Sequence, residues 1–375
     1  MITILADDLT SALDGAAPFA ARGLASTVAL HADAVGQCQA EVLALDLDTR
    51  SLLPEEARRR FLHAAMRMRR STLVYKTVDS TLRGHPGAET AAVLAGSGRV
   101  HAVIAPAFPA AGRTTSQGRQ FVDGQPVHLT AFARDPLTPV RSSRVVDAMR
   151  GAEPGSYTIH DAATDGDLDA LVARVGTLAE VLWVGSPGLA GALARALPDR
   201  RHVAGTMPWT PARRVLVVVG SLHPANDAQL AALGGAGVPL VPLSLEADSA
   251  DRDRTSGRLR QAFATHPVVA LVSPRAAGSD PAWPKALALR AGLIARRNAD
   301  CFDGLVVTGG DTARRVVDQL DAATLDLAGE VEAGVPFGVL HLPGRSIPFA
   351  TKAGGFGLPS TLLRCVDRLR GRFEV

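Results

Sequence analysis

Short hydrophobic runs alternate along the chain with longer amphipathic stretches rich in Ala, Leu and Arg. Short β-branched runs are typical of buried strands and the longer stretches of helices, so the alternation predicts βα units. The first half holds predicted strands ITILA, VLALDL, TLVYKT, AVIAPA and VLWVG, with helices that include residues 11–22, 54–69 and 87–95. The second half holds VLVVVG, VVALVS, LVVTGG and a return strand near GVLHL. The pattern predicts an α/β protein with two mostly parallel sheets, each flanked by helices.

The length of 375 residues corresponds to about two or three domains at roughly 150 residues per domain, and the two strand series favour two. The stretch TMPWTPARR, residues 206–214, has two prolines and no clear period, which indicates a linker. We therefore expect a first domain of residues 1–205 and a second of residues 215–375.

Composition excludes several classes of partner. The net charge is only +3, from 40 basic and 37 acidic residues, and the longest Lys/Arg run is 58–60, so no nucleic-acid partner is expected. Small anionic ligands remain compatible. The three cysteines are far apart and lack metal or disulfide spacing, which favours a reducing, cytoplasmic location. No apolar run reaches the roughly 18 residues of a membrane span, and the N-terminus lacks signal-peptide features, so no membrane partner is expected.

Polar residues follow the predicted strands in both halves. DDLT, LDTR, TVDSTLRG and AFPAAGRTT follow four strands of the first half, while GSLHPA and GGDTA follow two strands of the second. In open parallel α/β sheets, ligands bind outside the carboxyl ends of the strands, where loops and helix N-termini converge. Each half is therefore predicted to have its own ligand-binding crevice.

The richest of these strand ends is KTVDSTLRG, residues 76–84. One interpretation is a turn capped by an Asp, with an ordinary surface ion pair. The alternative is that Lys76 and Arg83 bind a carboxylate or phosphate while Asp79, Ser80 and Thr81 form hydrogen bonds with hydroxyl groups. The residue pattern leaves both interpretations open.

Two adjacent carboxylates, Asp7 and Asp8, end the first predicted strand. One of them suits the N-cap of the following helix. Paired carboxylates at a strand end also suit proton abstraction from a hydroxyl, or coordination of a metal that accompanies phosphates. The string DLDT at 46–49 is similar to the acidic motif of phosphatases that form an aspartyl-phosphate, but it is out of register for that motif.

The second half offers two glycine-rich segments. In TGGDTA, Gly309 and Gly310 lie where a strand meets a helix, which indicates either a tight turn capped by Asp311 or an anion site at the helix N-terminus. In TKAGGFG, residues 351–357, the glycines form either a mobile loop or a cradle in which Lys352 meets phosphates. Neither a P-loop nor a dinucleotide-binding motif occurs, and the ten histidines show no metal spacing, so metal ligands stay unknown.

Taken together, these segments resemble the four-carbon acid sugar kinase family, whose members include D-threonate, D-erythronate and 3-oxo-tetronate 4-kinases. The resemblance covers nearly the whole chain. It rests on eight motifs in the same order: ADDLTSALD, YKTVDSTLRG, APAFPAAGRTT, DPLTPV, VGSLHPA, TGGDTA, GVPFG and TKAGGFG. The KTVDSTLRG form is more similar to the threonate and erythronate kinases than to the 3-oxo-tetronate kinases.

The resemblance implies that the first domain binds the sugar acid, that the second binds ATP with Mg2+, and that phosphate passes to the C4 hydroxyl in the interdomain cleft. Carried over by position, the acid site comprises Asp8, Arg50, Asp79, Ser80, Thr81 and Leu82, with Asp7, Lys76 and Arg83 nearby. The nucleotide site comprises Ser221, Gly309, Gly310, Asp311, Thr312, Gly354 and Gly355, with His223 beside it and Lys352 offsetting charge. Asp7, Asp8 and Asp79 are the candidates for orienting or deprotonating the hydroxyl.

Three features depart from the usual family pattern: Ser11 stands in place of Gly, His223 in place of Ser, and the chain is shorter than most relatives. Two other functions compete with a kinase. A phosphatase acting on a phosphorylated sugar acid would not need the second, glycine-rich half, whereas a non-catalytic sugar-acid-binding protein would bind without turnover. The sequence leaves open which acid is used, which carboxylate is the base, and whether the chain forms a homodimer.

Overall fold

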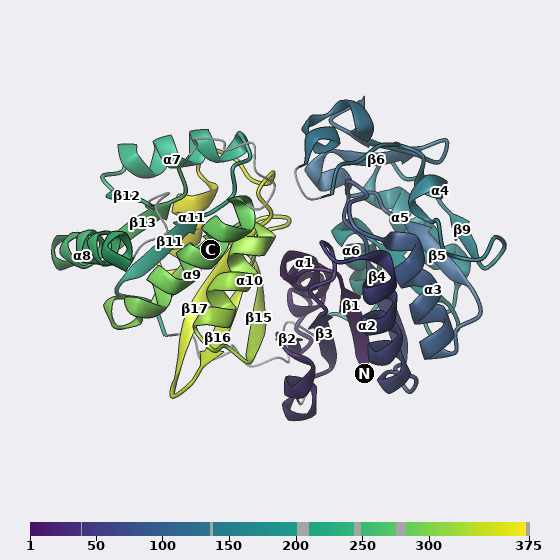
Figure 1. Ribbon diagram of the computed structural model, residues 1–375. Coiled ribbons are helices and arrows are strands. Elements are labelled where there is room, and N and C mark those ends of the chain that lie inside the picture. Colours follow the sequence, from purple (N-terminus) through teal and green to yellow (C-terminus); the bar gives the residue numbers. More distant parts are fainter. Residues whose placement is uncertain (39, 136–137, 201–209, 244–248, 275–282, 373–375) are drawn as a thin grey trace. The chain divides into compact units, whose positions relative to one another are not determined.

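The computed structural model describes residues 1–38, 40–135, 138–200, 210–243, 249–274 and 283–372. The chain divides into two compact units, Met1–Gly205 (unit 1) and Thr206–Val375 (unit 2), which Figure 1 colours from purple to yellow along the sequence. Residues 206–209 of the predicted linker lie outside the described residues, so the linker stays a prediction.

The sheet of unit 1 is entirely parallel between the paired strands. Its spatial order is β2 (Ser26–Ala29), β3 (Val42–Asp46), β1 (Ile2–Ala6), β4 (Leu73–Thr77), β10 (Leu182–Gly185), β5 (Ala102–Ala105) and β9 (Tyr157–Ile159). The register sets Ile4 of β1 opposite Ala44 of β3 and Tyr75 of β4. Every residue of β1, β3 and β4 is buried, as expected for parallel strands covered on both faces.

Helices flank this sheet, with α2 packed against α3, and with α1 and α5 packed against α6 (Figure 1). A small antiparallel sheet of β6, β7 and β8 follows β5 in the chain. The helices are α1 (Leu9–Ala20), α2 (Pro54–Arg67), α3 (Pro86–Ser97), α4 (Val145–Ala148), α5 (Asp165–Val175) and α6 (Pro187–Arg195), with short turns η1 (Ala32–Gln37), η2 (Pro109–Ala111), η3 (Val127–Leu129) and η4 (Ala131–Arg134). The small sheet comprises β6 (Arg113–Ser116), β7 (Arg119–Val122) and β8 (Gln125–Pro126).

The sheet of unit 2 is parallel in its first five strands and antiparallel at its other side. Its order is β12 (Leu240–Pro242), β13 (Val268–Val272), β11 (Val215–Val219), β14 (Gly304–Thr308), β17 (Arg345–Lys352), β16 (Pro336–Leu342) and β15 (Thr324–Glu330). Its helices are α7 (Ala225–Gly235), α8 (Ser249–Thr265), α9 (Trp283–Arg297), α10 (Gly310–Gln319) and α11 (Thr361–Leu369), with η5 (Ala299–Cys301).

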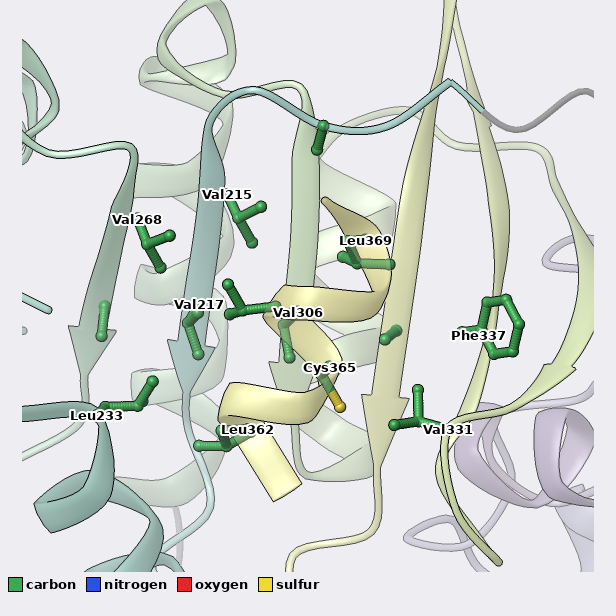
Figure 2. Packing of buried hydrophobic residues seen from close by; sticks show 14 of the residues in the cluster. Val215, Val217, Leu233, Val268, Val306, Val331, Phe337, Leu362, Cys365 and Leu369 are labelled. Atoms are coloured by element: carbon green, nitrogen blue, oxygen red, sulfur yellow. The ribbon is translucent and has the colours of Figure 1, made fainter. Parts of the chain in front are cut away.

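One core of unit 2 lies between α11 and the sheet. Figure 2 shows Leu362, Cys365 and Leu369 of α11 directed at the strand residues Val217 and Val306. All five are buried, and α11 carries its apolar residues on one face, so the helix closes this side of the sheet. This packing holds the carboxyl ends of β11, β14 and β17 in place.

The predicted architecture of two mostly parallel α/β sheets is confirmed, and each predicted strand lies within about two residues of an observed one, whereas β2, β6 to β9, β12, β15 and β17 were not predicted. The first helix begins at Leu9 rather than at Ser11, because Asp8 is its N-cap and accepts the Ser11 N–H at 2.7 Å. The third helix begins at Pro86, one residue earlier than expected, since proline fits the first helical position.

Candidate active site

Three neighbouring strands of unit 1 end in polar loops that meet at one edge of the sheet. β1 lies between β3 and β4, so the segments after Ala6, Asp46 and Thr77 come together. The backbone N–H groups of Thr49 and Arg50 both donate to the Asp7 carbonyl oxygen, at 2.8 and 3.1 Å. This pairing fixes the second loop against the first.

Arg50 links the two adjacent carboxylates of the first loop. Its Nε and Nη2 donate to Asp7 Oδ2 and Oδ1 at 2.7 and 2.9 Å, and its Nη1 pairs with Asp8. Nη2 also donates to the hydroxyl of Ser11 at 2.8 Å, so this serine adds a polar contact to the cluster. Asp7 is 2% exposed, whereas Asp8 and Arg50 are each 15% exposed.

The electrostatic environment separates the roles of these groups. Burial raises the pKa of Asp8 to about 6; Arg50 acts against this increase and the neighbouring Asp7 adds to it. Burial would lower the pKa of Arg50, but the surrounding carboxylates outweigh it and the pKa lies well above its usual value. Asp8 is therefore a partly exposed carboxylate that binds a proton more tightly than an ordinary aspartate.

Asp79 is the centre of the third loop. It accepts hydrogen bonds from Arg83 Nε and Nη2, both at 2.9 Å, from the backbone N–H groups of Thr81 and Arg83, and from the Thr81 hydroxyl. Burial alone would raise the pKa of Asp79, but Arg83 and Arg50 outweigh it and hold the pKa far below the usual range. Arg50 Nη1 lies 4.0 Å from Asp79 Oδ1, which joins the two groups of charges.

The loop around Asp79 has an unusual backbone conformation. Leu82 has φ +67°, a left-handed conformation that is uncommon for a residue with a side chain. Its N–H donates to the Asp79 carbonyl at 2.8 Å. Arg83 extends from this turn to Asp135, at 3.2 Å, and lies 5.3 Å from the centre of the Phe132 ring. Local hydrogen bonding therefore maintains a turn that directs Arg83 along the loop.

Lys76 has a different environment from that of the other predicted acid contacts. β4 ends at Thr77, and Lys76 is 1% exposed, with its Nζ 2.5 Å from Glu89 Oε2. Burial raises the pKa of Glu89, Lys76 opposes this, and Asp7 adds to it. The structure thus pairs Lys76 with a carboxylate that sequence analysis missed, and a direct contact of Lys76 with the acid stays a prediction.

Gln120 of β7 is a second residue that sequence analysis missed. It is fully buried and donates from Nε2 to the carbonyl oxygens of Ser80, at 2.8 Å, and Pro106, at 3.3 Å. Its Oε1 accepts the Thr115 hydroxyl at 2.6 Å. The small antiparallel sheet is therefore tied to the Asp79 loop by side-chain bonds from a residue about 40 positions further along the chain.

In unit 2, the segments after β11, β14 and β17 lie close together. Gly309, the N-cap of α10, has φ +91°, and a Cβ there would lie 3.1 Å from Ser221 Cβ. A Cβ on Gly354 would lie 2.1 Å from Ser221 Oγ, and one on Gly355 would lie 3.3 Å from His223 Nε2. The positive φ of Gly309 and the close approach at Gly354 favour glycine, and the contacts bring together the predicted residues of all three loops.

The remaining predicted nucleotide residues belong to the first turn of α10. Gly310 begins the helix, Asp311 is exposed, and Thr312 is buried against Gly220. His223 accepts the N–H of Ala225 at Nδ1, at 3.2 Å, so it caps its own loop.

Lys352 is buried next to these loops and is 1% exposed. Its Nζ donates to Asn226 Oδ1 at 2.9 Å and to the carbonyl oxygens of Ala353 and Gly354 at 3.3 and 3.4 Å. Burial lowers the pKa of Lys352 to about 8. Asn226, which sequence analysis also missed, donates to the carbonyls of Ser221, His223 and Gly354. The contact of Lys352 with phosphates stays a prediction.

Two searches of the described residues gave negative results. No group of three or more His, Cys, Asp or Glu side chains among them is arranged to hold a metal ion. None of the helices in the same residues is both long enough and apolar enough to cross a membrane.

Comparisons with known proteins match both units. Residues 2–156 match a family described as a sugar-binding N-terminal domain, and residues 216–362 match one described as a nucleotide-binding C-terminal domain. The chain is 36% identical to a D-threonate kinase from Bordetella bronchiseptica, over 99% of this chain and 98% of that protein. It is 34% identical to a D-threonate kinase from Cupriavidus necator, over 96% and 95%. A D-erythronate kinase from Heliobacterium modesticaldum is 28% identical, over 98% and 97%.

Solved structures support the fold. A protein from Salmonella typhimurium LT2 superposes with a TM-score of 0.78 at 22% identity, covering 97% of this chain and 98% of that one. A Haemophilus influenzae protein superposes with a TM-score of 0.70 at 21% identity, with the same coverage. The family that the eight sequence motifs predicted is thus confirmed by identity along nearly the whole chain: this protein belongs to the four-carbon acid sugar kinases.

Proposed function

We propose that this protein transfers the terminal phosphoryl group of ATP to the C4 hydroxyl of a four-carbon sugar acid, and that D-threonate is its preferred acid. The observation that carries the proposal is identity of 31–36% to three D-threonate kinases over at least 96% of this chain. The related D-erythronate and 3-oxo-tetronate kinases are 27–29% identical. All of these relatives are named as kinases, so a phosphatase or a non-catalytic binding protein is not favoured.

The polar cluster of unit 1 supplies the chemistry for a polyhydroxy carboxylate. Arg83 is 21% exposed and Arg50 15%, so both present positive charge that an acid can reach. Asp8 and Asp79, 15% and 11% exposed, supply acceptors for hydroxyl groups. We assign the carboxylate of the acid to Arg83 and its hydroxyls to the two aspartates.

Among the three candidate bases, the environment favours Asp8. Asp7 is 2% exposed and Arg50 holds both of its oxygens, whereas Asp8 is 15% exposed and Arg50 holds only one of its oxygens, the other accepting the Ser11 N–H. Asp79 has a pKa far below its usual range, so it binds a proton too weakly for a base at neutral pH. Asp8 is more exposed than Asp7 and its pKa of about 6 is close to working pH, which suits proton removal from the C4 hydroxyl.

The glycine-rich loops of unit 2 suit the phosphates of ATP. The N-cap of α10 is Gly309, which offers no side-chain acceptor, so the first N–H groups of the helix suit an anion. The hydroxyl of Thr308, immediately before it, is fully buried and has no hydrogen-bond partner among the described residues. Mg2+ bound to the phosphates would offset their charge; no three-residue acidic group for it occurs in the described chain, so it would arrive with the nucleotide.

Phosphoryl transfer needs little covalent chemistry from a protein, so positioning and charge neutralisation dominate. Asp8 orients the C4 hydroxyl and accepts its proton, Arg83 and Arg50 hold the acid, and the Gly309 and Gly354 loops hold the nucleotide. Transfer requires that the hydroxyl on unit 1 reaches the terminal phosphate on unit 2.

An assay of ADP release with D-threonate, D-erythronate, L-threonate and 3-oxo-tetronate tests the proposal. The expected result is ATP-dependent turnover with the highest kcat/KM for D-threonate. A parallel assay of phosphate release from the phosphorylated acids should give nothing above background. Absence of ADP release with all four acids would contradict the proposed function, and a higher kcat/KM for another acid would contradict only the preference.

A further inference from the structure

A buried ion pair lies close to the cluster of unit 1 that contains Asp7, Asp8 and Arg50. Lys76 of β4 and Glu89 of α3 are each 1% exposed, with Nζ and Oε2 2.5 Å apart. The ammonium group also lies 5.4 Å from the centre of the Phe61 ring. Protein therefore encloses both side chains almost completely, and a direct contact of Lys76 with the acid stays a prediction.

Thr49 connects the Lys76–Glu89 pair to the loop that follows β3 and carries Arg50. The Thr49 hydroxyl, which is fully buried, donates to Glu89 Oε1 at 3.1 Å. The backbone N–H groups of Thr49 and Arg50 donate to the Asp7 carbonyl. The turn at Thr49 and Arg50 is thus fixed at two points, one on Asp7 directly after β1 and one on Glu89 of α3.

A second bond from the start of α3 holds the same turn. His85, the N-cap residue of α3, bonds through Nε2 to the Leu52 carbonyl at 2.7 Å, and the Leu52 N–H donates to the Thr49 carbonyl at 2.9 Å. Gly84 brings the backbone close to this group, since a Cβ there would lie 2.9 Å from Asp7 Oδ2. The first turn of α3 therefore determines where the 49–52 segment lies.

Burying two charges costs solvation that their mutual attraction often fails to recover, so an ion pair at this depth is weak evidence for a stabilising role. Its geometry indicates another one. We propose that Glu89, held in place by Lys76, is a positioning residue: it fixes Thr49 and thereby sets the Arg50 guanidinium against Asp7 and Asp8. This inference rests on the proposed function for its kinetic consequences, but its structural consequence is independent of it.

The contacts make a specific prediction about which ligand is affected. Glu89 acts through Arg50, which belongs to the acid site, and the nucleotide loops belong to the other unit. Loss of the hydrogen bond between Thr49 and Glu89 should therefore weaken binding of the sugar acid and leave binding of ATP nearly unchanged. A purely structural role would instead lower the fraction of folded enzyme, which reduces kcat without altering either KM.

The test compares three variants of the full chain. Thr49→Val removes the hydroxyl with little change of shape, and Thr49→Ser restores it. Thr90→Val is the matched control, because Thr90 is fully buried, lies next to Glu89 on α3, and its hydroxyl has no hydrogen-bond partner among the described residues. We expect the KM for D-threonate to rise about tenfold in Thr49→Val, the loss of one hydrogen bond to a charged group. Thr49→Ser, Thr90→Val and the KM for ATP should stay within about twofold of wild type.

Two further measurements keep the result interpretable. If Glu89 acts through Arg50, then Thr49→Val should add little to Arg50→Lys in a double-mutant cycle. A crystal structure of Thr49→Val should show the Arg50 guanidinium displaced from Asp7, which needs no turnover and so holds even if the proposed function fails. An unmoved Arg50 in that crystal structure would overturn the proposal, as would equal increases of KM for acid and ATP, or full additivity with Arg50→Lys.

Discussion

At the scale of single residues, the acid cluster shows how one residue type takes different roles from its neighbours. Asp7 is buried and accepts two hydrogen bonds from Arg50. Asp79 accepts hydrogen bonds from Arg83 and from the Thr81 hydroxyl, and Asp8 is partly exposed. The first is a fixed anchor, and the second organises a turn. Asp8 combines a partly exposed side chain with a pKa raised to about 6, so we propose that it accepts the proton.

The pKa of Asp8 predicts a pH limit on activity. Asp8 must be ionised to accept a proton, so kcat/KM should fall about tenfold per pH unit as the pH falls below about 6. The free energy of unfolding changes in the opposite direction, because the folded state holds the Asp8 proton more tightly than the unfolded chain does. The stabilising contribution of this proton is present at low pH and is lost as the pH rises from 3.8 to about 6.

Steady-state kinetics between pH 5 and 8 check this prediction. Asp8→Asn should lower kcat by about a hundredfold or more and abolish the limb near pH 6. A kcat/KM that stays constant from pH 8 down to pH 5 in wild type, or an unchanged limb in Asp8→Asn, would assign proton transfer to another group.

The residues of the site divide into those that the sequence could predict and those that it could not. Asp8, Asp79 and Gly309 were identified because each belongs to a contiguous polar or glycine-rich segment at a strand end. Glu89, Gln120 and Asn226 were missed because each lies outside the recognised motifs and acts on a loop about 40 to 130 residues away in the chain. Only the three-dimensional fold brings these three residues next to the loops that they contact.

At the scale of elements, one continuous sequence motif, residues 76–84, spans both the end of a strand and the turn that follows it. Lys76 and Asp79 belong to one continuous motif, yet β4 ends at Thr77, so Lys76 points into the protein and Asp79 belongs to the turn. Long apolar runs such as those of β1 and β11 were predicted correctly because parallel strands are buried on both faces. The short strands β6 to β8 were missed, since each has at most four residues and their sequence is largely polar.

The link between β7 and the Asp79 loop gives a prediction at this scale. Gln120→Leu keeps the approximate volume but leaves the Ser80 and Pro106 carbonyls and the Thr115 hydroxyl without their partner. We expect a loss of about 3 kcal/mol in the free energy of unfolding, together with a higher KM for D-threonate because the Ser80 to Arg83 turn loses its support.

Urea denaturation and steady-state kinetics measure the two effects. Phe121→Leu serves as the control, since Phe121 is the next residue of β7, alternates to the other side of the strand and is half-buried. An unchanged KM for the acid in folded Gln120→Leu would show that the small sheet does not position the loop.

At the scale of the whole molecule, we propose that each of the two units binds one of the two substrates. Family matches to a sugar-binding domain and a nucleotide-binding domain fall separately on unit 1 and unit 2. Each unit places its polar or glycine-rich loops at the carboxyl ends of parallel strands, where ligands bind in such sheets. The two substrates should therefore be separable by mutation.

Two substitutions probe this division. Asp79→Ala removes the centre of the acid loop and should abolish turnover. Gly310→Val adds a branched side chain at the first position of α10, beside the helix N-terminus proposed for phosphate. The positive φ of this turn belongs to Gly309 rather than to Gly310, so valine at 310 acts on the ligand and not through backbone strain.

Calorimetric titration of a non-hydrolysable ATP analogue into both folded variants measures whether the acid and the nucleotide bind to separate units. We expect Asp79→Ala to bind the analogue within about twofold of wild type, and Gly310→Val to lose at least about tenfold in affinity, or about 1.4 kcal/mol. If Asp79→Ala lost nucleotide affinity as severely as Gly310→Val, the assignment of the acid to unit 1 and of ATP to unit 2 would be wrong.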